Sequence, residues 1–145
     1  MKKEKIILLV EDNEGDAELI LEALNNSRTT SHVIVINNGE DAMQFLKEHE
    51  EDTQEKPLPD IILLDLNLPK LDGKEVLQYV KQNQATKRIP VIILTTSSLQ
   101  KDIKDALDSH ANAYIVKTGD IEHLMNLIKS IENFWVNFAI FPQKT

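Results

Sequence analysis

Five short aliphatic runs, separated by amphipathic segments, are the feature that most constrains the fold of this chain. Each run is nearly continuous instead of alternating with polar residues, which is typical of strands covered on both faces in a parallel sheet. The runs are KIILLV (5–10), HVIVI (32–36), DIILLD (60–65), PVIILT (90–95) and AYIVK (113–117). We therefore expect five strands in one parallel sheet.

Apolar residues at helical spacing follow each of the five runs. These stripes are Ala17, Ile20, Leu21 and Leu24; Ala42, Phe45 and Leu46; Val76, Leu77 and Val80; Leu99, Ile103, Ala106 and Leu107; and Ile121, Leu124, Ile128, Ile131, Trp135 and Phe138. Strands that alternate with helices predict a doubly wound α/β fold with right-handed crossovers. No linker divides the sequence, so we expect one domain over residues 1–145, with a charged surface loop at 47–59.

Composition argues against several kinds of site. The chain has no cysteine, so it has neither disulfides nor thiolate metal ligands. Its formal net charge of −8 makes it a poor candidate for direct DNA binding, because neutralising phosphates needs clustered Lys and Arg. No segment approaches the ~20 apolar residues of a membrane span, and the apolar run near the N terminus is too short for a secretory signal. We expect a cytoplasmic protein without nucleic-acid or membrane partners.

Polar residues stand where four of the five predicted strands end. Glu11 and Asp12 follow the first strand, Asp65 ends the third, Thr95 the fourth and Lys117 the fifth. Each has an ordinary explanation on its own, as a turn former, a helix cap or a solvated charge. In open parallel sheets, ligands bind at the carboxyl ends of the strands. The shared position of these residues therefore indicates one site.

The chemistry of such a cluster points to a metal and a phosphoryl group. Three carboxylates held together repel one another, and their pKa values would rise unless a cation were present. Without Cys or a nearby His, the fitting cation is a hard one with oxygen ligands, and Mg²⁺ matches best. Asp65 could then attack phosphorus and form an aspartyl phosphate. Mg²⁺ and Lys117 would neutralise the transferring oxygens, and Thr95 could hydrogen-bond one of them.

Four motifs, in this order and spacing, resemble the receiver domain of two-component response regulators. They are VEDNEGD (10–16), LLDLNLPKLDG (63–73), ILTTSS (93–98) and AYIVK (113–117). The resemblance covers residues 5 to about 131. It implies a flavodoxin-like fold, with five strands in the order 2-1-3-4-5 and five helices.

The resemblance also implies a metal site around Mg²⁺. Its ligands would be Glu11, Asp12, Asp65 and the backbone carbonyl of Asn67. Glu11 stands where many family members have Asp, and its longer side chain could reach the metal directly or through water. Gly73, at the end of the second motif, would supply a turn conformation before the third helix.

The remaining implied roles concern the phosphoryl group and the switch. Asp65 would be the phospho-acceptor, Lys117 the phosphate-binding lysine, Thr95 the switch hydroxyl and Tyr114 the aromatic ring that changes rotamer on activation. Thr118 departs from the family pattern, which usually has proline there, commonly after a cis peptide bond. A cis bond before a non-proline residue costs about 2.5 to 4 kcal/mol. The sequence therefore leaves the state of the Lys117–Thr118 bond and the pose of Lys117 open.

The function implied by the resemblance is a signalling switch. A single-domain response regulator would accept a phosphoryl group on Asp65 from a histidine kinase, in a Mg²⁺-dependent reaction, with no enzymatic activity beyond autophosphorylation and autodephosphorylation. One alternative is a Mg²⁺-dependent phosphohydrolase with an aspartyl nucleophile. Such enzymes generally need a second acid two residues later, where this chain has Asn67. The other alternative is a degenerate receiver that acts only as a binding module.

The C-terminal region, about 120–145, extends beyond a minimal receiver and is aromatic-rich. Met125, Leu127 and Phe134 form a second apolar set beside the core stripe, and Trp135 is expected to pack. This region could fold back over its own sheet, or form a homodimer through the last helix, the fifth-strand face and the tail. It resembles the small regulators paired with bacterial phytochromes, which would imply a homodimer and a light-sensing histidine kinase. We therefore expect no DNA-binding helices after the receiver.

The four histidines are expected to be structural or surface residues. They lie on separate segments, away from the strand ends that carry the acids: His32, His49, His110 and His123.

Overall fold

A computed structural model of the chain describes residues 4–25 and 31–140, except for the side chains of residues 136–138. Five parallel strands form one sheet in the order β2-β1-β3-β4-β5. The predicted flavodoxin-like order is therefore confirmed. The elements are β1 (Lys5–Val10), α1 (Glu14–Asn25), β2 (Ser31–Ile36), α2 (Gly39–Glu48), β3 (Ile61–Leu64), α3 (Gly73–Gln82), β4 (Val91–Thr95), α4 (Gln100–Asp108), β5 (Ala113–Val116), α5 (Ile121–Ile131) and the π-helical segment η1 (Glu132–Phe138).

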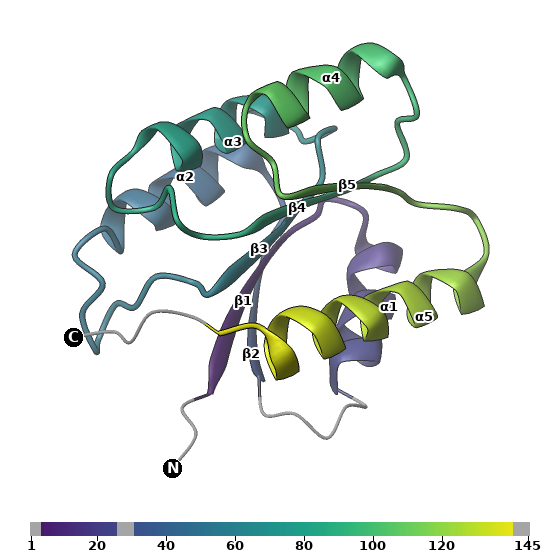
Figure 1. The fold of residues 1–145 in the computed structure, drawn as a ribbon, viewed down its shortest axis with the longest axis horizontal. Coiled ribbons are helices and arrows are strands. Elements are labelled where there is room, and N and C mark those ends of the chain that lie inside the picture. The colour runs from purple at the N-terminus through teal and green to yellow at the C-terminus, as the bar shows by residue number, and fades with distance from the viewer. Residues whose placement is uncertain (1–3, 26–30, 141–145) are drawn as a thin grey trace.

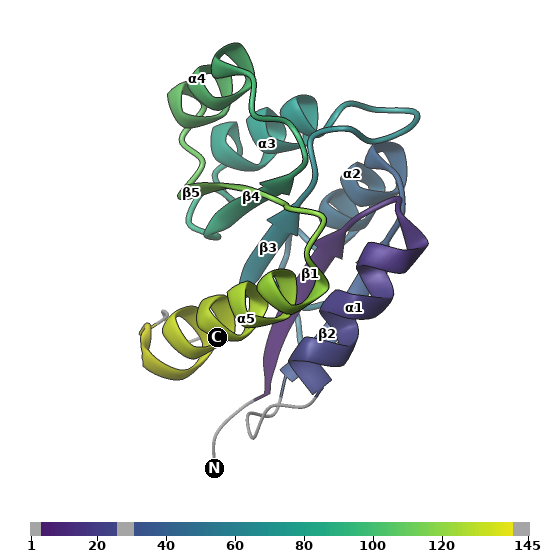
Figure 2. The same ribbon diagram turned by 90° about the vertical axis from the view of Figure 1, so that its right-hand side faces the viewer.

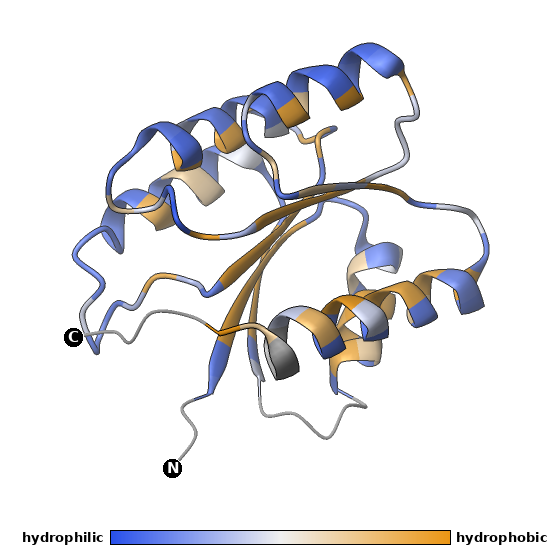
Figure 3. Ribbon diagram, in the orientation of Figure 1, coloured by the Kyte–Doolittle hydropathy of each residue, from blue (hydrophilic) through white to orange (hydrophobic). Residues whose placement is uncertain are grey.

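The helices cover the two faces of the sheet in two groups. α2, α3 and α4 lie on one face, and α1 and α5 lie side by side on the other (Figures 1 and 2). Each group closes its own apolar core against one face of the strands. Figure 3 shows the hydrophobic colour along the central strands and on the helix sides turned toward them. The sheet is thus doubly wound, as the alternation of strands and helices predicts.

Burial separates the central strands from the edge strands. Every residue of β3 and β4 is buried, as is most of β1, because helices cover both faces. The expectation of full coverage is wrong for β2 and β5, whose residues are at best half-buried. These two strands form the edges of the sheet, where one side has no neighbouring strand and the helices reach only part of the surface.

The apolar stripe predicted for α4 is only partly a core stripe. Ala106 is the buried residue of this helix, whereas Leu99 and Leu107 are 66% and 48% exposed. The prediction is also wrong for Ile121, at the start of α5, which is 60% exposed. These side chains belong to helix ends near the β5 edge. The sheet extends no further there to cover them.

The end of the chain continues the last helix. Helical structure runs from α5 through η1 to Phe138. Met125, Leu127 and Trp135 pack against the core that α1 and α5 share, while Phe134 is 58% exposed and meets Trp135 edge to face. Most of the second apolar set therefore covers the chain's own core. The Phe138 side chain and residues 141–145 of the predicted tail lie outside the described part of the structure.

Gly73 is required by a close contact between α3 and the end of β3. The expectation that it supplies a turn conformation is wrong, because no described glycine has a positive φ; the left-handed residue of this turn is Lys70, with φ 69°. A Cβ on Gly73 would lie 2.2 Å from the backbone oxygen of Asp65 and 2.6 Å from Cα of Leu66. The first turn of α3 therefore lies directly against the backbone of the predicted acceptor.

We expect Gly73→Ala to lower the free energy of unfolding by about 1 to 3 kcal/mol, because the added methyl group overlaps backbone atoms that cannot rotate away. Urea denaturation measures this change. Gly119→Ala is the matched control, since a Cβ there meets nothing within 4 Å, and its effect should stay within about 0.5 kcal/mol. Equal effects of the two substitutions would contradict the proposed close contact.

Candidate functional site

The sheet brings the predicted site residues together at the carboxyl ends of its strands. The backbone N–H of Glu11 donates to the carbonyl of Ile36, and that of Asp65 donates to the carbonyl of Val10, each at 3.0 Å. The N–H of Lys117 donates to the carbonyl of Thr95 at 2.7 Å. These bonds continue the strand pairing by one residue. They fix where each functional side chain leaves the sheet.

Three carboxylates form a compact cluster there. One oxygen from each of Glu11, Asp12 and Asp65 lies within 4.8 Å of the others. Glu11 and Asp65 are buried and Asp12 is exposed, so the cluster opens to solvent on the Asp12 side. Oxygen donors of this kind suit a hard divalent cation. The backbone N–H of Asn67 donates to Asp65 Oδ1 at 3.1 Å. The role of the Asn67 carbonyl as a metal ligand stays a prediction.

Lys117 is the counter-ion of this cluster. Its ammonium donates to Glu11 Oε1 at 2.7 Å, to Asp16 Oδ2 at 2.8 Å and to Asp65 Oδ2 at 3.3 Å. The lysine side chain is only 4% exposed. The Lys117–Thr118 bond, like every described peptide bond, is trans. Lys117 therefore reaches the predicted acceptor with Thr118 in place of proline.

Asp16 is a third acidic partner of Lys117, which the strand-end pattern does not predict. It lies in the first turn of α1 and was present in the motif VEDNEGD, but no strand ends on it. The position of Asp16 in the sequence does point to the site. Because α1 begins only three residues after Glu11, the first turn of this helix still lies at the same edge of the sheet. Strand-end positions alone therefore do not predict this contact.

Burial sets the protonation of the site. Removal from water raises the pKa of Glu11 to about 7, with a further increase from Asp65, and hydrogen bonding to Lys117 only partly offsets this. Burial opposes the charge on Lys117, but the hydrogen bonds to Asp16 and Glu11 outweigh it, so the pKa of Lys117 is raised. The lysine therefore stays charged at neutral pH. It is the counter-ion that the buried carboxylates have without a metal.

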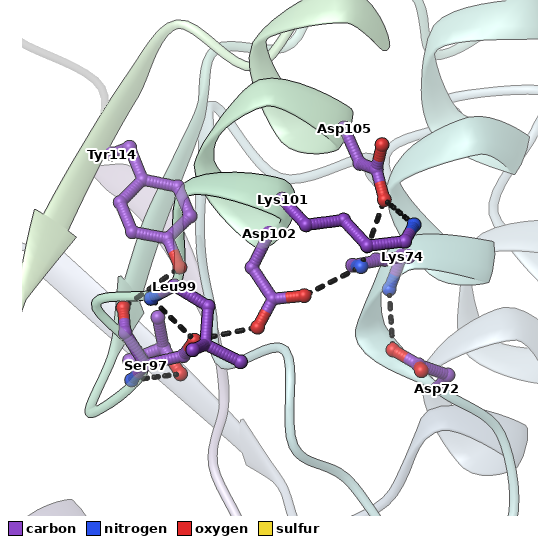
Figure 4. Close-up of polar contacts among 9 residues, drawn as sticks. Asp72, Lys74, Ser97, Leu99, Lys101, Asp102, Asp105 and Tyr114 are labelled. Carbon is purple, nitrogen blue, oxygen red and sulfur yellow. Dashed lines mark hydrogen bonds and ion pairs between the residues drawn. The ribbon is translucent and has the colours of Figure 1, made fainter.

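The predicted switch residues meet at the loop after β4. Thr95 is fully buried, and its hydroxyl accepts from the N–H of Ser97 at 3.4 Å. The Tyr114 hydroxyl donates to the Ser97 carbonyl at 2.9 Å, as Figure 4 shows. Burial raises the pKa of the Tyr114 hydroxyl, and the hydrogen bond to Ser97 only partly offsets this increase. Thr95 and Tyr114 thus both contact Ser97, by way of its two peptide groups.

A polar network extends from this loop to two helices (Figure 4). The Ser97 hydroxyl donates to Asp102 at 2.5 Å, and Lys74 of α3 pairs with Asp102 at 2.6 Å and Asp105 at 3.0 Å. Lys101 also pairs with Asp105, at 2.7 Å. A displacement of Ser97 would therefore disturb the packing of α4 on α3.

The histidines lie outside the acidic cluster, as expected. Among the described residues, the carboxylates of Glu11, Asp12 and Asp65 form the one group with metal-ligand spacing. His49 has a structural contact, because its ring stacks on Phe45 and its Nδ1 lies 2.7 Å from the Phe45 carbonyl oxygen. No helix in the described ranges has the length and apolar character needed to cross a bilayer.

We expect Lys117→Ala to destabilise the metal-free protein by about 3 kcal/mol at pH 8, because it leaves two buried carboxylates without a counter-ion. A raised carboxyl pKa means that the folded protein binds this proton more tightly than the unfolded chain, so stability falls as the pH rises through about 7. At pH 6, where Glu11 takes up a proton, the loss should be smaller. Denaturation in EDTA at both pH values measures it.

Lys104→Ala is the control for this substitution. Lys104 pairs with Asp108 on the surface of α4, and its side chain is 76% exposed. Its removal should change the free energy of unfolding by about 0.5 kcal/mol or less at either pH. A larger loss for Lys117→Ala at pH 6 than at pH 8 would contradict the role of Lys117 as counter-ion.

Comparisons with known proteins agree with this geometry. Residues 7–129 match the family described as response regulator receiver domain. Response regulator Rcp1 of Synechocystis sp. is 42% identical over 138 residues, which are 95% of this chain and 93% of Rcp1. A probable methanogenesis regulatory protein, FilR2 of Methanothrix harundinacea, is 38% identical over 94% of this chain and 87% of FilR2.

Solved structures give the same result. The crystal structure of the Mn²⁺-bound form of Rcp1 has a TM-score of 0.89 and covers 96% of this chain and 99% of that one, at 42% identity. The phosphorylated cyanobacterial phytochrome response regulator RcpA has a TM-score of 0.90 and covers 97% of this chain and 100% of that one, at 44% identity. The buried acid at the end of β3, its acidic neighbours and the lysine after β5 therefore lie on the fold of these regulators, and the chain belongs to the response regulator receiver domain family.

Proposed function

We propose that this protein is a phosphorylation-dependent signalling switch that accepts a phosphoryl group on Asp65 from a histidine kinase. The observation that carries the proposal is the position of the Asp65 carboxylate. It is buried at the end of β3, 3.3 Å from the Lys117 ammonium and in one cluster with Glu11 and Asp12. A nucleophilic carboxylate thus lies next to groups that neutralise phosphoryl oxygens.

The donor set fits a bound Mg²⁺ ion. Glu11, Asp12 and Asp65 supply carboxylate oxygens, and the carbonyl of Asn67 is the further ligand that we assign. The Mn²⁺-bound form of Rcp1 supports a divalent cation in this family. When bound, the ion supplies positive charge that offsets the repulsion between the carboxylates and the negative charge of the transferring phosphoryl group.

The chain's own residues perform the transfer as follows. A carboxylate oxygen of Asp65 forms the new bond to phosphorus while the bond from phosphorus to the donor's histidine nitrogen breaks, and its electron pair returns to that nitrogen. Lys117 donates to an oxygen of the transferred group and reduces its charge. Thr95, which is buried at the end of the neighbouring strand, donates its hydroxyl to another of these oxygens.

The same contacts would report phosphorylation at the surface. The phosphoryl group adds about 1.5 to 2 negative charges at Asp65. If the Thr95 hydroxyl turns to it, the bond from the Ser97 N–H is lost, and Ser97 also anchors Tyr114 and Asp102. We infer that Tyr114 then changes rotamer. The surface formed by α4 and β5 would change with it and be read by a downstream protein.

The similarity to Rcp1 and RcpA supports a phytochrome-type histidine kinase as the donor, because RcpA is described as a phytochrome response regulator. Such kinases use ATP, so we place the protein in the cytoplasm. Phosphotransfer from purified histidine kinases of the source organism, with and without their stimulus, would identify the donor.

The phosphohydrolase alternative lacks an acid. Asn67 occupies the position two residues after Asp65, and it donates its backbone N–H to the Asp65 carboxylate. An amide side chain cannot protonate a leaving group. Multiple turnover of small phosphate esters would be evidence for a hydrolase, whereas a single stoichiometric label supports the switch.

We expect Asp65→Asn to abolish labelling by acetyl phosphate with Mg²⁺, because the amide is a poor nucleophile. The label on the unsubstituted protein should be acid-labile and sensitive to hydroxylamine, as an acyl phosphate is. Asp108→Asn, an exposed acid on α4, is the control and should label normally. The same label on the Asp65→Asn protein would disprove the acceptor assignment, and no label on the unsubstituted protein would favour the degenerate receiver.

We further propose that two copies of the chain associate through α5, η1 and the β5 face. Apolar side chains are exposed at both ends of the last helix, Ile121 at 60% and Phe134 at 58%, and the edge strand β5 is only half-buried. Such side chains, when they lie together, tend to mark interaction surfaces. The Trp135 side chain packs against the core, so it is a poor target for testing this contact.

We expect Phe134→Ser to weaken concentration-dependent association by about tenfold, since a buried aromatic contact contributes over 1 kcal/mol. Sedimentation equilibrium of the phosphorylated and unphosphorylated protein measures it. Val35→Ser, 40% exposed on the opposite edge strand β2, should leave association unchanged. A monomer at all concentrations in both states would refute the dimer.

A further inference from the structure

Asp16 is a partner of Lys117 that neither the acceptor chemistry nor the metal cluster uses. Its Oδ2 lies 2.8 Å from the lysine ammonium, closer than the 3.3 Å of Asp65. Glu11 and Asp65 belong to the group with metal-ligand spacing, and Asp16 does not. The structure therefore places an additional negative charge beside the ammonium that a phosphoryl group at Asp65 would need.

Helix capping does not explain this side chain. In a capping box, the third residue of a helix accepts a hydrogen bond from the N–H of the capping residue. Here Asn13 accepts from the N–H of Asp16 at 2.9 Å, but its own N–H donates to Glu11 Oε2 at 3.2 Å. The Asp16 carboxylate is not engaged in the cap and turns to Lys117 instead.

The lysine has no donor to spare in this arrangement. An ammonium group carries three N–H donors, and Lys117 has three carboxylate partners. A phosphoryl group on Asp65 brings acceptor oxygens that require one of these donors. Of the three partners, Asp16 is the most exposed, with 29% of its side chain accessible against 1% for Glu11 and 8% for Asp65. Of the three carboxylates, Asp16 is therefore the one that water can solvate most readily once its contact with Lys117 is lost.

We propose that Asp16 competes with the phosphoryl group for Lys117. In the unphosphorylated protein Asp16 holds the lysine ammonium toward α1, and it releases the ammonium when the phosphoryl group forms. The inference rests on the proposed function and adds a residue to it. Asp16 is a positioning residue, because it acts on the phosphoryl group only through Lys117. Its contact with the lysine must be given up on phosphorylation, so it lowers the affinity of the site for a phosphoryl group.

The test compares the binding of beryllofluoride, a tetrahedral analogue of the phosphoryl group, at saturating Mg²⁺ by titration calorimetry. Asp16→Asn should bind it about threefold or more tightly than the unsubstituted protein, because a charge-assisted hydrogen bond no longer competes. Glu14→Gln is the matched control: it removes one negative charge from the same helical turn, and no ion pair of Glu14 with Lys117 is found in the described structure. Its affinity should stay within about twofold.

A measurement on the unsubstituted protein makes the test independent of variant folding. Carbon-13 NMR follows the side-chain carboxyl of Asp16 while beryllofluoride is added in the presence of Mg²⁺. Its resonance should shift as the carboxylate exchanges the lysine for water. A resonance that stays in place while the analogue binds would overturn the proposal.

The outcomes separate this proposal from the function on which it rests. No binding of the analogue by the unsubstituted protein would reject both. Normal binding by that protein, with Asp16→Asn equal to Glu14→Gln or weaker, would reject the role of Asp16 and leave the phosphorylation switch standing. Weaker binding of Mg²⁺ alone by Asp16→Asn would assign Asp16 to the metal and also reject the competition.

Discussion

The interaction on which the site depends is the one between a buried ammonium and the carboxylates around it. Lys117 lies within hydrogen-bonding distance of Glu11, Asp16 and Asp65, and little of it reaches solvent. Buried carboxylates without a partner would protonate or destabilise the fold. The lysine therefore supplies the positive charge that these carboxylates lack in the metal-free protein. In the proposed function it becomes a ligand of the phosphoryl group, and Mg²⁺ takes over part of its role as counter-ion.

The parallel sheet makes this concentration of charge possible. Backbone hydrogen bonds at the ends of β1, β3 and β5 hold Glu11, Asp65 and Lys117 in register. The close approach of Gly73 to the Asp65 backbone fixes the acceptor strand from the other side. In the proposed function, a change in charge at Asp65 would be transmitted to the loop at Ser97, which side-chain hydrogen bonds connect to Tyr114 and α4.

Strand ends predict the clustering of the acids with Lys117, because parallel strands place their carboxyl ends at one edge. The sheet order follows from the resemblance to receiver domains. The strand ends do not predict which side chains pair. Asp16 was missed because its contact depends on the orientation of the first turn of α1. The turn motif predicts a turn conformation for Gly73, but its close approach to the backbone explains this glycine instead. Helical periodicity predicts Leu99, Leu107 and Ile121 in the core, but all three are exposed. Periodicity shows which residues share a face, not where the sheet stops.

The most direct test of this account is a crystal structure of the protein with Mg²⁺ and beryllofluoride. The account predicts beryllium bonded to a carboxylate oxygen of Asp65, Mg²⁺ among the three clustered carboxylates, and the Lys117 ammonium on a fluorine atom and detached from Asp16. If no beryllofluoride or metal is found in the acidic cluster, or the ammonium points away from Asp65, the central role of Lys117 as an exchangeable counter-ion is wrong.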